Sequence, residues 1–498
     1  YSFYVQAATE RMDREVHQKT CIEAGQGRLV YIDCDAVDNW GHYLAYSRQL
    51  KETAGQMGLN VSILTNRKLA PDIHPALTGH LIPTFTDHSW ARDPASTQRF
   101  SEELGAALAA TAESNAGEYF FIYMYTAGLW HAEAIEKMID GHDNISANVN
   151  LFHDYATDEN DPEVKRRWKP FLERCIRHPN LVVTVPTETM ANDFAKAFGV
   201  RLPVAPHPTT TFDDEESVSM IAGDSHTRGD QPSVLFPGGV RPEKGFALSL
   251  SASTTLSRDY GIACHLRAVV RADTPQELTA GIENAREAGV TVSSGVLDES
   301  SFKALLTSGD VLVCPYLPSA FARRTSGMII DALLLGRPVV AIKGTWLGDV
   351  AETTGAGLAC APDSDSIVSA VRKVIRGFDE FSTAAARARR NYFLSNSWQA
   401  LVSSVLEGDS ARPESEPHMT GEADAITEAE AVNESKPSDF RRANELLRHR
   451  DYQQALRIYV TLLAQHHLDI YEFNASLATK RLGYGSIPEA MIALEKRR

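Results

Sequence analysis

Two loops in the second half of the sequence combine glycines with cations, as an anion-binding site requires. The first is Phe236–Gly245, which follows a predicted strand, opens a predicted helix and contains Arg241 and Lys244. Glycines allow the backbone to approach a ligand closely, and a helix N-terminus favours an anion. Arginine forks onto phosphate oxygens and lysine adds a point charge, so together they would neutralise a diphosphate. For this loop alone, a surface turn with two solvated cations is the alternative interpretation.

The second loop, Arg323–Gly327, also leads from a predicted strand into a predicted helix. It offers two further cations, the Ser326 side chain and the backbone N–H groups of a helix N-terminus. Asp331 lies inside that helix, where a carboxylate can accept hydrogen bonds from two ribose hydroxyls. The alternative is an acid on a solvated helix face, which the otherwise apolar residues from Met328 to Leu335 disfavour.

The elements that must position these loops are strands alternating with helices. Because the strands are continuously apolar, they predict parallel sheets covered on both faces. Two such doubly wound halves face each other across a cleft, with ligands bound at the carboxyl ends of the strands. The strand candidates are 29–33, 61–64, 80–85, 119–125, 148–153 and 181–185, then 233–236, 265–270, 290–293, 311–315 and 338–342.

Composition shifts divide the chain into six regions. We expect an N-terminal lead-in at 1–27, a Rossmann-like half at 28–211 and an acidic connection at 212–232. A second Rossmann-like half follows at 233–408, and an acidic, proline-containing linker at 409–437. Residues 438–498 form an all-α segment, since the pattern around Tyr452–Tyr459 recurs 35 residues later around Ile487–Leu494. This spacing resembles tetratricopeptide repeats; a plain helical hairpin is the alternative.

Charge and cysteine usage exclude several functions. The 498 residues carry a net charge of −16 with no clustered basic face, so a nucleic-acid partner is not expected. No stretch reaches the length of a membrane span. Six cysteines are scattered without a CxxC or Cys/His cluster, which suggests neither a zinc site nor disulfides and favours a reducing, cytoplasmic location. Peripheral attachment to a membrane stays open.

The second half resembles the retaining GT-B glycosyltransferases of family 4, also described as glycosyl transferases group 1. The matching motifs, about 80 residues apart, are Pro242–Gly245 and the segment from Ser326 through Asp331 to Ala341. A glycine-containing segment at Gly348–Leu358 follows. The first half agrees more loosely, so the resemblance covers about residues 28–408.

This resemblance implies a GT-B fold and a nucleotide-diphosphate-sugar donor, with no resident cofactor. The donor's diphosphate would lie on Arg241, Lys244 and the amides of Ser326 and Gly327, and Asp331 would hold its ribose. His153 would reach the donor sugar from the first half, and Gly41 would let the backbone approach the diphosphate. The acceptor, a glycan or a protein, would lie against the first half. The predicted site residues are therefore His153, Arg241, Lys244, Gly41, Arg323, Ser326, Gly327 and Asp331.

The sequence departs from the family pattern at three positions. Gly239 stands where an arginine is usual, although Arg241 is able to substitute for it. Arg323 replaces the acid that normally contacts the donor sugar, and the second acid is Asp331 rather than glutamate. These changes leave the donor sugar open.

No metal is implied, because the cations supply the charge that a metal would bring. Asp33-Cys34-Asp35 has the form of a DxD metal motif, but in a GT-B context we interpret it as a strand end.

Three hypotheses follow from the sequence. The first is a glycosyltransferase acting with retention, whose repeats recruit a protein partner or mediate self-association. The second is a non-catalytic scaffold that binds a nucleotide or glycan, which Arg323 favours. The third is another GT-B enzyme, such as a sugar phosphorylase or an epimerase.

Overall fold

The computed structural model describes residues 21–22, 25–37, 43–70, 75–91, 93–115, 117–152, 162–212, 231–270, 274–295, 297–407, 454 and 456–458. Residues Tyr1–Ser415 form one compact unit, and Glu416–Arg498 form another. In the second unit the described residues, Gln454 and Leu456–Ile458, are helical. Apart from these four, the predicted linker at 409–437 and the repeats at 438–498 lie outside the described residues, as does most of the acidic connection.

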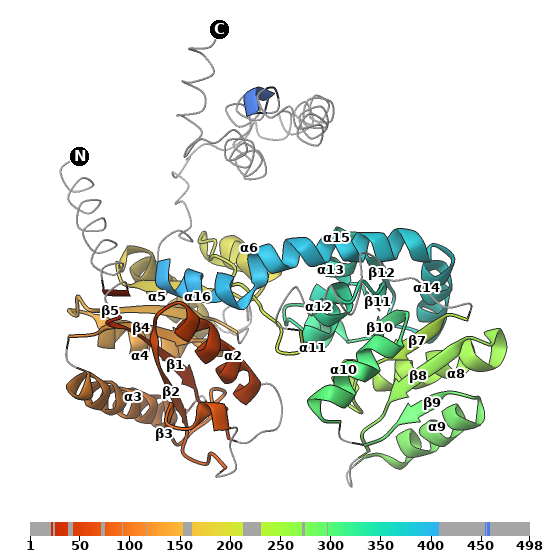
Figure 1. The fold of residues 1–498 in the computed structure, drawn as a ribbon, viewed down its shortest axis with the longest axis horizontal. Coiled ribbons are helices and arrows are strands. Elements are labelled where there is room, and N and C mark those ends of the chain that lie inside the picture. Colours follow the sequence, from red (N-terminus) through yellow and green to blue (C-terminus); the bar gives the residue numbers. More distant parts are fainter. Residues whose placement is uncertain are drawn as a thin grey trace. The chain divides into compact units, whose positions relative to one another are not determined.

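The first half contains a six-stranded parallel sheet with the order β3-β2-β1-β4-β5-β6. Each predicted strand is present, within a few residues of its predicted bounds (Figure 1). The strands are β1 (Gly27–Asp33), β2 (Asn60–Asn66), β3 (Leu81–Phe85), β4 (Tyr119–Met124), β5 (Ile145–Asn150) and β6 (Leu181–Thr184). Its helical elements are α2 (Tyr43–Gln56), η1 (Pro75–Leu77), α3 (Pro94–Ser114), α4 (Leu129–Ile139), α5 (Pro162–Arg177) and α6 (Glu188–Phe198).

The second half repeats this topology with the order β12-β11-β10-β7-β8-β9, again fully parallel. Its strands are β7 (Ser233–Phe236), β8 (Ala263–Arg267), β9 (Thr291–Ser293), β10 (Val311–Cys314), β11 (Val339–Ile342) and β12 (Gly357–Cys360). Its helical elements are η2 (Pro242–Lys244), α8 (Phe246–Tyr260), α9 (Gln276–Glu287), α10 (Glu299–Ser308), α11 (Pro318–Phe321), α12 (Gly327–Leu334), α13 (Trp346–Thr354), α14 (Ser364–Arg376), α15 (Phe378–Asn396) and α16 (Trp398–Glu407).

Both faces of each sheet are buried, as the continuously apolar strands predict. In β1, Val30 and Ile32 point into one hydrophobic cluster, whereas Leu29 and Tyr31 point into another on the opposite face. Successive side chains of a strand alternate between faces, so both faces need a helical cover. The prediction of two Rossmann-like doubly wound halves is therefore confirmed.

Helices α15 and α16 connect the two halves, which the sequence did not indicate. The predicted boundary placed residues up to 408 in the second half. In the structure, Trp398, Leu401 and Val405 of α16 join the hydrophobic cluster of the first half, and Trp398 packs edge-on against Tyr46. The chain thus returns to the first half after the second sheet is complete (Figure 1).

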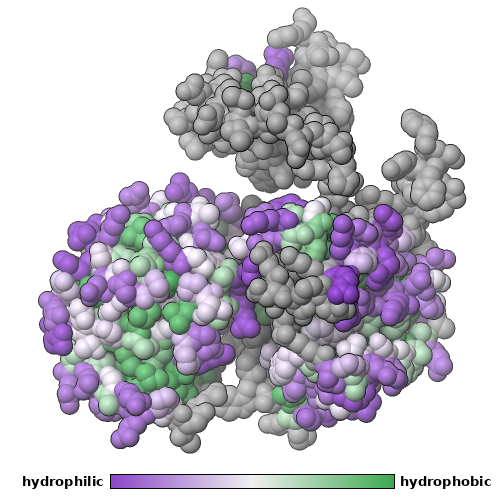
Figure 2. Space-filling view, turned by 180° about the vertical axis from the view of Figure 1, so that it is seen from behind, coloured by the Kyte–Doolittle hydropathy of each residue, from purple (hydrophilic) through white to green (hydrophobic). Residues whose placement is uncertain are grey.

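No helix in the described ranges is long and apolar enough to cross a membrane. From behind, the described surface shows hydrophilic residues throughout, with hydrophobic ones gathered over the second half (Figure 2).

Candidate functional site

The order of the second sheet creates a crevice between β7 and β10. From β7 the chain continues to β8 and β9 on one side, and from β10 it continues to β11 and β12 on the other. Ligands of open parallel sheets bind outside the carboxyl ends of the strands at such a reversal. Both loops singled out in the sequence leave the carboxyl ends of these two strands, so the fold brings them to the same crevice.

Gly245 lies where the first loop packs against the segment that follows β10. It has a φ of +64°, and a Cβ atom at this position would lie 1.9 Å from the Pro315 carbonyl oxygen. The adjacent backbone is also hydrogen-bonded across the crevice, from Leu317 N to the Glu243 carbonyl at 2.9 Å. The absence of a side chain at Gly245 therefore allows η2 to lie directly on the segment after β10.

Lys244 lies over the ring of Tyr316, with its Nζ 5.2 Å from the ring centroid. Burial lowers the pKa of Lys244, and the charge of Arg241 lowers it further. Arg241 itself is exposed and pairs with Glu243 at 2.5 Å. Of the two cations in the first loop, Lys244 is therefore the less hydrated. Electrostatic contacts are stronger where water is displaced.

Arg267 is a third cation near Lys244 and Tyr316, and sequence reasoning missed it. It ends β8, where burial lowers the pKa of the guanidinium. Its Nε is buried without a hydrogen-bond partner, and its Cζ lies 5.4 Å from the Phe302 ring centroid. A buried donor without a partner costs free energy in the absence of a ligand. The predicted strand, 265–270, placed Arg267 inside the strand rather than at its carboxyl end, so the sequence did not mark it as a site residue.

Ser326 and Gly327 form the start of α12. Ser326 is the N-cap, and its Oγ accepts from Met328 N at 3.4 Å. Ser326 also lies beside Tyr316, the residue that Lys244 covers. Lys244 and the positive end of α12 therefore lie on either side of Tyr316, whereas the predicted diphosphate contacts of the two loops stay a prediction.

Asp331 is buried in α12, with 1% of its surface exposed. Its Oδ1 accepts a hydrogen bond from Thr209 Oγ1 at 2.7 Å. The carbonyl oxygen of Thr209 in turn accepts a hydrogen bond from Trp398 Nε1 at 3.0 Å. Asp331 thus anchors the segment after the first sheet. The predicted ribose contact stays a prediction, and it requires Asp331 to exchange Thr209 for a ribose hydroxyl.

The state of Asp331 predicts a pH-dependent effect of Asp331→Asn. Burial raises the pKa of Asp331 to about 7. Between about pH 4 and pH 7 the folded protein therefore keeps a proton on Asp331 that the unfolded chain has already released. The stabilisation that this proton gives is complete below about pH 4 and is lost as the pH rises through 7. Asparagine stays neutral at every pH. We therefore expect the free energy of unfolding of the variant, minus that of the wild type, to be about 2 kcal/mol larger at pH 8 than at pH 5. Urea midpoints at both pH values measure this; an equal difference at both would contradict the assignment.

Arg323 bridges the two halves. Its Nε pairs with Asp193 of α6, and its carbonyl accepts from Thr187 Oγ1 at 3.4 Å. Its predicted contact with the donor stays a prediction, because the structure places its guanidinium against the first half. Gly41 and His153, the site residues predicted in the first half, lie outside the described residues.

Asp33 and Asp35 lie at the end of β1, as the strand-end interpretation requires. Burial and the charge of Asp35 raise the pKa of Asp33 to about 7. Asp35 accepts from Ser89 N at 2.9 Å, so protein donors already occupy this carboxylate. Within the described part of the chain, no three potential metal ligands cluster together.

Two parallel Rossmann-like sheets, with cations gathered at a strand-order reversal of the second, define a two-domain α/β architecture. Residues 231–377 match the family model described as glycosyl transferases group 1. That match spans the whole crevice described above, from β7 through α14. No curated protein sequence matches this chain.

Solved structures identify the fold as GT-B. A glycosyltransferase from Rickettsia africae shares 11% identity and a TM-score of 0.56, covering 77% of this chain and 97% of its own. Sucrose-phosphate synthase from Thermosynechococcus elongatus shares 15% identity and a TM-score of 0.53, covering 76% and 97%. HepE from Anabaena, in complex with UDP, shares 14% identity and a TM-score of 0.50, covering 77% and 99%. At these identities the likeness shows the fold alone.

Proposed function

We propose that this protein is a glycosyltransferase that moves a sugar, with retention, from a nucleoside-diphosphate sugar to a glycan or protein acceptor. The observation that carries the proposal is the gathering of Lys244, Arg267 and the N-terminus of α12 around Tyr316 at the crevice. The family match over residues 231–377 supports sugar transfer as the reaction class. The UDP bound to the GT-B protein HepE supports a nucleoside diphosphate as the leaving group.

In this proposal the protein acts mainly through charge and position. As the bond between the sugar's anomeric carbon and the diphosphate breaks, negative charge grows on the diphosphate. Lys244, Arg241 and the α12 N-terminus stabilise that charge at the carboxyl edge of the second sheet. Holding donor and acceptor together supplies the remaining acceleration. Retention rests on the family resemblance, in which the departing diphosphate takes the acceptor proton on the same face.

Arg267→Met tests whether the third cation contributes to donor binding. We expect nucleotide affinity to fall about tenfold, because a charge-assisted contact is lost. The variant's own free energy of unfolding should stay equal or rise by about 1 kcal/mol, because a desolvated cation without a full set of partners is removed. Nucleotide titration and urea unfolding measure the two effects. Arg258→Met, at an exposed arginine paired with Asp259, is the matched control.

If Arg267→Met leaves nucleotide affinity unchanged, Arg267 lies outside the donor site. If Arg267→Met lowers nucleotide affinity and lowers the free energy of unfolding by the same amount, the role of Arg267 is structural. Arg258→Met should change neither quantity.

A non-catalytic scaffold is the second candidate. It is favoured by Arg323, which stands where the family has an acid and is engaged by Asp193. The deciding experiment is donor hydrolysis, in which water replaces the acceptor. Slow release of nucleoside diphosphate by the wild type that is lost in Lys244→Ala would support the enzyme; binding without any release would support the scaffold.

We infer that the C-terminal repeats bind a protein partner or a second copy, which deletion of residues 438–498 tests directly by partner capture. All six cysteines are buried and none forms a disulfide, which supports a reducing, cytoplasmic location.

A further inference from the structure

A separate cavity of about 600 Å³ lies where α12, α13 and α15 meet the first half. The first half contributes the junction of β6 and α6, from Pro186 to Glu188, together with Val204 and Ala205. The lining of this cavity includes neither Lys244 nor Ser326, so the cavity is distinct from the donor crevice. Its volume falls within the range of about 300–1,000 Å³ that is typical of small-molecule sites.

Two alanines of α15 leave this space open. Ala384 and Ala388 are one turn apart, so both face the same side of the helix, and both line the cavity. They lie with Leu333 of α12 and Val350 of α13 in a small hydrophobic cluster. Because an alanine side chain ends at Cβ, α15 packs here without filling the gap between the helices. The cavity therefore has an apolar wall with room beside it.

Aromatic side chains form another part of the lining. Trp346, the first residue of α13, lies edge-on to the His207 ring, with the two ring centroids 6.3 Å apart. The Tyr392 hydroxyl donates a hydrogen bond to the His207 carbonyl, and the His207 N–H donates one to Asn396 Oδ1 at 2.9 Å. Since these polar groups already have partners, this part of the lining offers a ligand mainly the rings of Trp346 and Tyr392.

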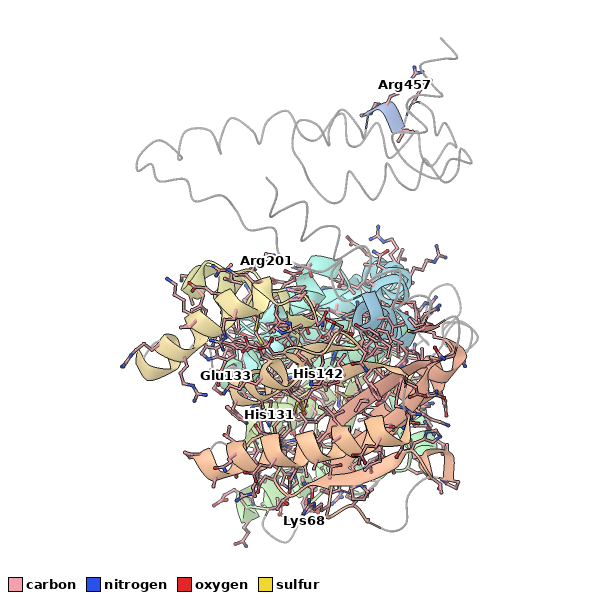
Figure 3. All side chains as sticks on the ribbon, turned by 90° about the vertical axis from the view of Figure 1, so that its left-hand side faces the viewer. Lys68, His131, Glu133, His142, Arg201 and Arg457 are labelled. Atoms are coloured by element: carbon pink, nitrogen blue, oxygen red, sulfur yellow. The ribbon has the colours of Figure 1, made fainter. Side chains whose placement is uncertain are left out.

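The two charged residues of the lining, Glu188 and Arg387, differ in their partners. Glu188 is paired with Arg201, which is labelled in Figure 3. Arg387 is exposed and makes no ion pair with any residue in the described ranges. Asn391, one turn further along α15, adds an exposed amide to the same side of the helix. The described residues therefore leave one positive charge of the cavity uncompensated, with an amide donor beside it.

We propose that this cavity binds an organic anion with an aromatic, apolar body. The body packs against Ala388, Leu333 and Trp346, and the acidic group accepts hydrogen bonds from Arg387 and Asn391. Charge complementarity selects an anion, because Arg387 is the charged group without a partner. The apolar wall disfavours a sugar, whose hydroxyls would lose their hydrogen bonds to water there. Because both halves line the cavity, the ligand contacts both. This proposal does not depend on the proposed sugar transfer.

The test uses two fluorescent probes that share one aromatic body, with the whole chain as receptor. Anilinonaphthalene sulfonate carries an anionic group, and phenylnaphthylamine lacks it; both become brighter in apolar surroundings. We expect the wild type to bind the sulfonate more tightly than the neutral probe. Arg387→Gln should weaken binding of the sulfonate about fivefold, because a charge-assisted contact is lost, and leave the neutral probe unchanged. Arg390→Gln, at an exposed arginine of the same helix that does not line the cavity, is the matched control and should change neither affinity.

Ala388→Leu tests the location independently of charge. The larger side chain should occupy the space beside Leu333 and remove binding of both probes, while thermal unfolding checks that the variant is folded. Three outcomes would overturn the proposal: the wild type binds neither probe, Arg387→Gln binds the sulfonate as the wild type does, or folded Ala388→Leu keeps both affinities. An equal loss of both probes in Arg387→Gln would overturn the anionic class, since Arg387 would then only shape the cavity.

Discussion

Replacing Lys244 with alanine is expected to lower donor turnover at least 100-fold, which corresponds to about 2.7 kcal/mol of lost transition-state stabilisation. The reason is its partly dehydrated position over Tyr316, where burial lowers its pKa and no protein carboxylate within salt-bridge reach neutralises it in the described structure. Released nucleoside diphosphate, measured with donor alone and then with acceptor, gives the loss. Nucleotide affinity should fall in parallel.

The matched control is Lys373→Ala, at an exposed lysine on α14 of the same half. It should leave both turnover and nucleotide affinity at wild-type values. Turnover retained in Lys244→Ala would show that the diphosphate lies elsewhere.

Introducing alanine at Gly245 is expected to destabilise the protein by about 3 kcal/mol and to remove nucleotide binding. The added Cβ would have to occupy a place 1.9 Å from the Pro315 carbonyl oxygen, and the residue would have to keep a φ of +64°. Since backbone cannot yield as a side-chain end does, η2 must separate from the segment after β10. Thermal unfolding should shift downward by about 5–10 °C.

Gly55→Ala is the control for this substitution. Gly55 lies inside α2 with nothing within 4 Å of its added Cβ, so the variant should be up to about 1 kcal/mol more stable. A Gly245→Ala protein with wild-type stability would mean that the two loops do not meet as described.

Much of this fold follows from apolar patterning. Strand β7 (Ser233–Phe236) has the predicted bounds, and β10 and β11 each differ from theirs by one residue. The reason is that a buried parallel strand needs an unbroken apolar run and its helix an apolar stripe, and both patterns survive in a single sequence. The two-sheet architecture of residues Tyr1–Ser415 was therefore predictable, whereas the repeats at 438–498 stay a prediction.

The helices that link the halves were harder to predict. Helix α15 was not predicted, because its buried positions include Ala384, Ala385 and Ala386, whose small side chains give little amphipathic contrast. Helix α16 lies within residues 233–408, which the sequence assigned to the second half. An apolar stripe shows that a helix is buried, but not which surface it covers.

The candidate site was predictable in part for a similar reason. Glycines and cations directly after a predicted strand indicate an anion-binding loop, which is why Lys244 and Ser326 were found. Arg267 was missed because its importance comes from the burial of its Nε, and burial of an atom at a strand end is a tertiary property. The partner of Asp331 was equally hidden, since Thr209 lies 122 residues away in the chain.

A nucleotide-sugar site at this crevice is tested most directly by the thermal stability of the wild type with UDP-, GDP-, ADP-, TDP- and CMP-sugars. A ligand at about 100 times its dissociation constant adds about 2.7 kcal/mol. We expect a clear upward shift with at least one nucleoside-diphosphate sugar, a smaller one with the monophosphate CMP-sugar and none in Lys244→Ala. No shift with any donor, or an equal shift in Lys244→Ala, would contradict a nucleotide-sugar site at this crevice.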